Sequence, residues 1–143
     1  MILATLTALY LYATGPQHAA VLAAPEVACI TAAVYLEAEG EPYIGKLAVA
    51  AVVRARAERA QLSPCAVITA RHQFSGLGRR VDSVHIGALA DSLGAAIASG
   101  SSKAPVPKCA GATHFDNNSN ARWTRVFPRV CSIGRHTFYR SNT

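Results

Sequence analysis

Residues 33–42 read AVYLEAEGEP, and this stretch decides how the whole chain is interpreted. Nearly every residue of 26–36 before it is small or apolar, as in a buried helix. Gly40 and Pro42 end that helix, because glycine favours a helix C-terminus and the residue before a proline avoids helical angles. Glu37 therefore lies on the last turn, where the helix dipole and apolar neighbours both favour the protonated acid. A protonated carboxyl can cleave a glycosidic bond; the alternative is a solvated acidic helix end.

Hydrophobic spacing and turn residues predict a mainly helical α+β chain on both sides of this stretch. Short segments that mix β-branched and aromatic residues between glycine or asparagine predict two strands. The helices are expected at residues 2–13, 25–38, 43–60, 63–70 and 87–99, and the strands at 113–115 and 137–139.

Length and composition indicate one catalytic domain, preceded by an apolar segment. The 143 residues are 51% hydrophobic and 15% charged, and they show no repeat or linker that would separate two modules. We divide the chain into residues 1–24 and a domain at 25–143. The first segment lacks a basic start, and its uninterrupted apolar part is too short for an ordinary membrane span. It is either a helix packed on the core or a weak retained anchor.

Charge is unevenly distributed along the chain. Residues 1–53 carry Lys46 and four glutamates, a balance of −3, whereas residues 54–143 carry 13 basic and 4 acidic residues, a balance of +9. The basic part predicts attraction to polyanions such as an anionic cell envelope; a merely soluble basic surface is the alternative. No nucleic-acid-binding motif accompanies these charges, so we expect no nucleic-acid partner.

Four short motifs resemble those of the SleB-type cell wall hydrolases. The family has EARGEP, then a glycine and an apolar helix, and this chain has EAEGEP with Gly45 after it. Three further motifs follow in the order that the family uses. They are QFS at 73–75, GATHF at 111–115 and IGRHTFYR at 133–140.

This resemblance implies a lysozyme-like single domain with a small β-sheet beside the catalytic cleft. It implies cleavage of the glycan strand of peptidoglycan, with Glu37 as the catalytic acid and no cofactor or metal. The residues expected to bind the sugars are Gln73, Ser75, His114 and Tyr139. For His114 and His136, a buried histidine satisfied by the backbone is the alternative.

The implied reaction is lytic transglycosylation between N-acetylmuramic acid and N-acetylglucosamine. The N-acetyl group of the muramic acid stabilises the cation, and its 6-hydroxyl attacks after Glu37 has acted as acid and then as base. Hydrolysis by a muramidase usually needs a second carboxylate. Glu39 and Glu41 share the turn with Glu37 and cannot easily face it across a sugar, and Asp116 is the other candidate.

Three positions depart from the family pattern. The arginine within EARGEP is Glu39, whose negative charge further favours the protonated form of Glu37. The tryptophan that often follows QFS is Gly76, and the asparagine that usually precedes Arg56 is Ala55. We expect the substrate contacts near Gly76 and Ala55 to differ from those of the family.

The four cysteines lack the CxxC spacing of zinc or redox sites. An even count in a chain expected to work outside the cytoplasm predicts two disulfides, and four buried thiols are the alternative. Sequence does not choose among the three possible pairings. The pairing that we expect joins Cys29 to Cys131 and Cys65 to Cys109.

Two other classes of function remain open at this stage. A zinc amidase would need histidine ligands, but His72, His85, His114 and His136 show no HxxxH, HxH or HExxH pattern. A non-catalytic wall-binding module would bind peptidoglycan without cutting it. We expect a monomer that acts in the periplasm or outside the cell, in the manner of a phage endolysin.

Overall fold

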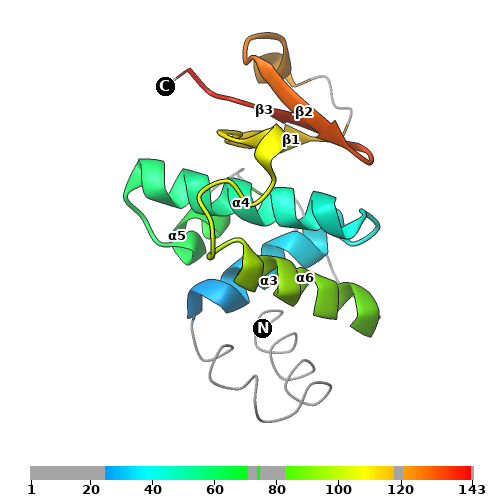
Figure 1. The fold of residues 1–143 in the computed structure, drawn as a ribbon. Coiled ribbons are helices and arrows are strands. Elements are labelled where there is room, and N and C mark those ends of the chain that lie inside the picture. Colours follow the sequence, from blue (N-terminus) through cyan, green and yellow to red (C-terminus); the bar gives the residue numbers. More distant parts are fainter. Residues whose placement is uncertain (1–24, 71–73, 75–82, 118–120, 143) are drawn as a thin grey trace.

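A computed structural model describes residues 25–70, 74, 83–117 and 121–142. Helix α4 lies between a three-stranded sheet and the pair α3 and α6 (Figure 1). The helices are α3 (Pro25–Ala38), α4 (Tyr43–Ala60), α5 (Pro64–Thr69) and α6 (Ile86–Ala98), with short 3-10 turns η3 (Pro107–Cys109) and η4 (Arg122–Arg125). The strands are β1 (His114–Asp116), β2 (Arg129–Ile133) and β3 (His136–Tyr139).

Helix α3 is buried on nearly all sides, which explains its almost uniformly apolar sequence. Ile30 and Ala33 are fully buried, and the helix packs against α4, α5 and α6. It ends at Ala38, whose carbonyl accepts a hydrogen bond from the Glu41 N–H at 3.0 Å. Pro42 follows in an extended conformation and begins α4, so the EAEGEP motif forms the corner between two core helices.

The sheet is antiparallel, with β3 between β1 and β2. The register of β1 on β3 places His114 opposite Tyr139 and Asp116 opposite Thr137. Strands β2 and β3 form a hairpin whose turn contains Gly134 at a φ of 55°. A left-handed angle of this kind favours glycine at this position.

One continuous hydrophobic core joins the helices to the sheet. Its fully buried members come from α3, α4, α6 and β3, so the sheet is anchored directly on the helical layer. They include Ile30, Val34, Val49, Val53, Ala95, Ala96 and Phe138.

The predicted elements agree closely with the observed ones. The helices expected at 25–38 and 43–60 are confirmed with the same bounds, and those at 63–70 and 87–99 shift by one residue at each end. Both predicted strands are confirmed within one residue, but β2 was not predicted. The helix expected at 2–13, and with it the choice between a packed helix and an anchor, lies outside the described residues.

The two predicted disulfides are present, but the expected pairing is wrong. Cys29 of α3 is bonded to Cys65 of α5, and Cys109 of η3 is bonded to Cys131 of β2. The reason is spatial: α3 packs against α5, and η3 packs against β2. Each disulfide therefore reinforces a contact between neighbouring elements.

Candidate active site

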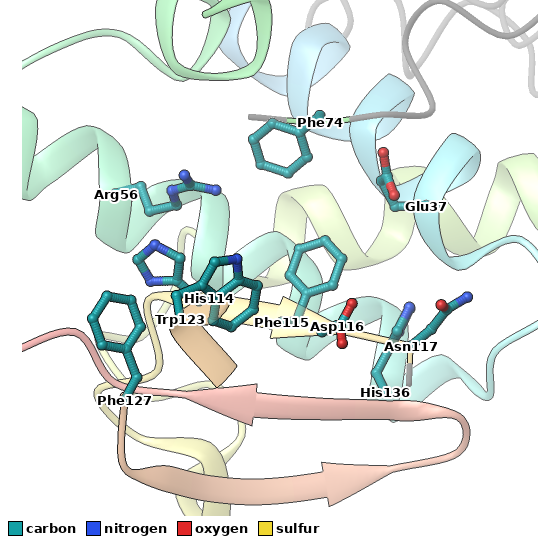
Figure 2. A pocket seen from close by; sticks show the side chains of 10 residues that line it. All are labelled: Glu37, Arg56, Phe74, His114, Phe115, Asp116, Asn117, Trp123, Phe127 and His136. Carbon is teal, nitrogen blue, oxygen red and sulfur yellow. The ribbon is translucent and has the colours of Figure 1, made fainter. Parts of the chain in front are cut away.

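A cavity of about 420 Å³ lies between the helical layer and the sheet. Its volume falls within the range of small-molecule binding pockets. Figure 2 shows Glu37 on the helical side and a row of polar and aromatic side chains on the sheet side. The lining residues are Glu37, Arg56, Phe74, His114, Phe115, Asp116, Asn117, Trp123, Phe127 and His136.

The three carboxylates of the EAEGEP motif have separate surroundings. Glu37 lines the cavity. Glu39 lies within 3.5 Å of both the Tyr35 hydroxyl and His85 Nε2, so it connects the end of α3 to the start of α6. Glu41 is buried against the β2–β3 hairpin. Of the three, only Glu37 is placed to meet a ligand in this cavity.

Glu41 fastens the hairpin to the corner between α3 and α4. Its carboxylate accepts hydrogen bonds from the Arg135 backbone N–H and from Arg135 Nε, each at 3.0 Å. Burial opposes its ionisation, but these hydrogen bonds and the charges of His136 and Arg135 together lower the pKa of Glu41. A side chain at Gly134 would collide with Glu41 Oε2, so this glycine also allows the close approach.

His136 lies on the sheet side of the cavity at its acidic end. The residue is 3% exposed, and its Nδ1 is buried with no hydrogen-bond partner among the residues that the structure describes. Burial and the Arg135 charge lower its pKa, although the charges of Glu41, Glu37 and Asp116 oppose the shift. The His136 ring therefore lines the same cavity as the two carboxylates Glu37 and Asp116.

Aromatic rings surround His114 at the other end of the cavity. Its ring centroid lies 5.3 Å from that of Trp123 and 5.0 Å from that of Phe127. Burial is the main cause that lowers the pKa of His114, and the charges of Arg56 and Arg59 lower it further, to about 4. The imidazole is therefore neutral at physiological pH.

A threonine hydroxyl contacts the His114 ring. The Thr113 hydroxyl accepts a bond from the Ser141 N–H at 2.8 Å and lies 3.0 Å from His114 Nδ1. The Thr113 hydroxyl is therefore the hydrogen-bond partner of His114 Nδ1 within the described part of the chain.

The predicted site residues are only partly brought together. Glu37 and His114 line the same cavity. Tyr139 does not line it; its ring packs edge-on against Trp123 at 5.4 Å. Gln73 and Ser75 lie outside the described residues, although Phe74 between them lines the cavity.

Sequence reasoning missed several cavity residues. Arg56 lies one helix away from Glu37 in the sequence, and its guanidinium carbon lies 5.3 Å from the Phe74 ring centroid. Trp123 and Phe127 lie among basic residues in the sequence, and the sequence did not place them in a cavity. Their spacing of four residues around η4 was the available signal, since the Phe127 N–H bonds to the Trp123 carbonyl and both rings face one side.

Two solved structures are similar to this chain along most of its length. The catalytic domain of the Bacillus cereus SleB protein is 26% identical, over 80% of this chain and 89% of that chain, with a TM-score of 0.61. The catalytic domain of the germination-specific lytic transglycosylase SleB from Bacillus anthracis is also 26% identical, over 82% and 95%, with a TM-score of 0.64. The fold and cavity define a lysozyme-like enzyme that cleaves peptidoglycan.

A sequence model of the Cell Wall Hydrolase family matches residues 40–139. The chain belongs to the cell wall hydrolase family. A comparison with curated proteins gives no match. Because its substrate is peptidoglycan, the enzyme works at the cell wall or outside the cell.

Within residues 25–70, 83–117 and 121–142, no helix is long and apolar enough to cross a bilayer. Across the same stretches, no group of three or more His, Cys, Asp or Glu side chains is arranged to hold a metal ion.

Proposed function

We propose that this enzyme cleaves the bond between N-acetylmuramic acid and N-acetylglucosamine as a lytic transglycosylase, with Glu37 as its single acid and base. The observation that carries the proposal is the position of Glu37, which alone of the EAEGEP carboxylates lines the cavity. The similar domain from Bacillus anthracis is described as a lytic transglycosylase, which supports the same reaction here.

The reaction begins with protonation of the glycosidic oxygen by Glu37. The bond from that oxygen to C1 of the muramic acid then breaks, and the N-acetyl carbonyl of the same sugar stabilises the positive centre. The Glu37 carboxylate next takes the proton of the 6-hydroxyl, whose oxygen bonds to C1. Glu37 is protonated again, and the product is a 1,6-anhydro sugar.

Other cavity residues would hold the sugars for this step. Trp123 and Phe127 offer apolar faces for pyranose rings at the end of the cavity away from Glu37. His114 offers a neutral imidazole ring for hydrogen bonds to the sugar. Gln73, Ser75 and Tyr139 stay predicted sugar contacts.

Hydrolysis of the same bond is the second candidate, because Asp116 also lines the cavity. Figure 2 shows Asp116 on the sheet side and Glu37 on the helical side, so a sugar can lie between two carboxylates. Such an arrangement would allow a muramidase reaction. Mass spectrometry of the products separates the two reactions, since an anhydro-muropeptide is one water lighter than its hydrolysed counterpart.

Glu37→Gln tests the central assignment. The amide keeps the shape of the side chain but has no acidic proton, so we expect cleavage of purified cell walls to fall by about 10²–10⁴-fold. Glu58→Gln is the matched control, because Glu58 is exposed on α4 away from the cavity. Near wild-type clearing of walls by a folded Glu37→Gln protein would show that another residue is the acid.

The remaining classes are separated by simple measurements. A zinc amidase would lose activity in EDTA and would release peptides, whereas a glutamate-dependent enzyme would do neither. A non-catalytic module would bind walls and give no soluble product. For the biological role, we propose lysis of a bacterial host from the periplasm or from outside; the phage origin stays a prediction.

A further inference from the structure

A second cavity of about 390 Å³ adjoins the first. The two share Arg56 and His114, so these side chains form a partition between them. The second cavity lies among the end of α4, helix α5 and the start of β1. Its lining residues are Arg56, Arg59, Ala60, Leu62, Val67, Ala70, Thr113, His114 and Ser141.

The two cavities differ in charge. Glu37 and Asp116 line the first, whereas no carboxylate is among the described residues that line the second. Arg56 and Arg59 are three residues apart on α4 and so lie on one side of the helix. Both contribute to the lowered pKa of His114, after burial, so their positive potential extends to the partition.

The lining of the second cavity is otherwise small and apolar. Its apolar surface comes from the side chains of Leu62, Val67 and Ala70. The Thr113 hydroxyl already forms hydrogen bonds with Ser141 and His114, so it is not a ready partner for a ligand. An unsubstituted sugar, with hydroxyls on every side, would find few partners here. A group that combines a carboxylate with methyl groups would match both the arginines and the apolar surface.

The glycan strand of peptidoglycan carries such a group on every second sugar. Muramic acid bears a lactyl ether, with a methyl group, and the peptide stem that begins on it carries free carboxylates. We infer that the second cavity binds this carboxylate-bearing substituent while the sugars lie beside Glu37. The inference rests on the proposed function, since it places a muramic acid in the first cavity.

The carboxylate has two possible sources, the peptide stem or the lactyl group itself after the stem has been removed. The test uses Glu37→Gln protein as a non-cutting binder and measures Kd by calorimetry for three soluble glycans of equal length. The first is a strand with peptide stems, the second is the same strand stripped by an amidase, and the third is a neutral chitooligosaccharide.

Adding Arg59→Gln to this protein should raise Kd for a carboxylate-bearing strand by up to about fivefold, the upper end of the range for an exposed charge pair. The Kd for the chitooligosaccharide should not change, and Arg59→Lys should restore most of the loss. Lys108→Gln is the matched control, since it removes one exposed positive charge away from both cavities.

Each outcome decides the inference. A rise only for the peptide-bearing strand identifies the stem as the ligand, a rise only for the stripped strand identifies the lactyl carboxylate, and a rise for both shows that the cavity accepts either carboxylate. An equal change for all three glycans, no change for any, or no binding of any glycan would overturn the inference. Failure of the proposed function gives a different result, because the Glu37→Gln protein would then still cut walls.

Discussion

Replacing Glu41 by glutamine should destabilise the protein although Glu41 does not line the cavity. The Glu41 side chain is 3% exposed and accepts two hydrogen bonds from Arg135. An amide keeps one acceptor oxygen, but its NH₂ group must then face an N–H donor of Arg135. One hydrogen bond is lost and the other loses its charge.

The magnitude follows from these two bonds. A hydrogen bond from the backbone to a buried charged group contributes about 1.5–3 kcal/mol. The Arg135 side chain is 74% exposed, so its ion pair contributes only about 0.2–1 kcal/mol. We expect the free energy of unfolding to fall by about 2–3 kcal/mol, which lowers Tm by roughly 5–12 °C.

Thermal unfolding followed by circular dichroism checks this prediction, with Glu58→Gln as the control for loss of one surface carboxylate. The pH dependence gives a second check. The pKa of Glu41 in the folded protein lies below its ordinary value of 4.5. Its contribution is therefore complete above pH 4.5 and is lost as pH falls through the lower folded value.

The difference in Tm between wild type and Glu41→Gln should consequently shrink on acidification. The reasoning is refuted if the two proteins have the same Tm at pH 7. It is also refuted if the gap between them persists well below the pH at which Glu41 becomes protonated.

Three further predictions follow from the cavity and its surroundings. The disulfide from Cys109 to Cys131 should contribute about 2–4 kcal/mol, so reduction or a double serine variant should lower Tm; a peptide map that joins Cys29 to Cys131 would contradict the assignment. The His114 ring should titrate near pH 4 by NMR, so a midpoint near 6.5 would show that the ring is not buried beside arginines. Activity on walls should fall with salt as the Debye length shortens from about 10 Å at 0.1 M to about 3 Å at 1 M. A variant in which the exposed Arg122, Arg125 and Arg129 are all changed to glutamine should show the same loss of activity at low salt. Full activity of this variant would mean that the three arginines only keep the surface soluble.

Much of the helical layer was predictable because its signals are local. The apolar run before Glu37 and the Gly40 to Pro42 turn fix the end of α3 and the start of α4 to the residue. Strand β2 was missed because it is a short edge strand that pairs only with β3. Its buried positions, Cys131 and Ile133, alternate with more exposed ones over just five residues, which is too short for a clear pattern.

The site was less predictable because it is assembled from distant segments. Glu37 and His114 were found from motifs and Asp116 was named as a possible second carboxylate, whereas Arg56 joins their cavity only after α4 and β1 have packed together. The disulfide pairing failed for the same reason, since it depends on which elements become neighbours. Glu41 shares a turn with Glu37 in the sequence, but its partner in the fold is Arg135, 94 residues away.

The disulfides have a consequence for how substrate enters. One joins α3 to α5 and the other joins η3 to β2, so neither links the helix that carries Glu37 to the sheet across from it. An oxidising environment therefore stabilises the helical layer and the sheet side of the cavity separately, because each disulfide lies within one of them. The opening that a long polymer must enter therefore depends on noncovalent contacts between the two layers, which include the shared hydrophobic core and the hydrogen bonds from Arg135 to Glu41.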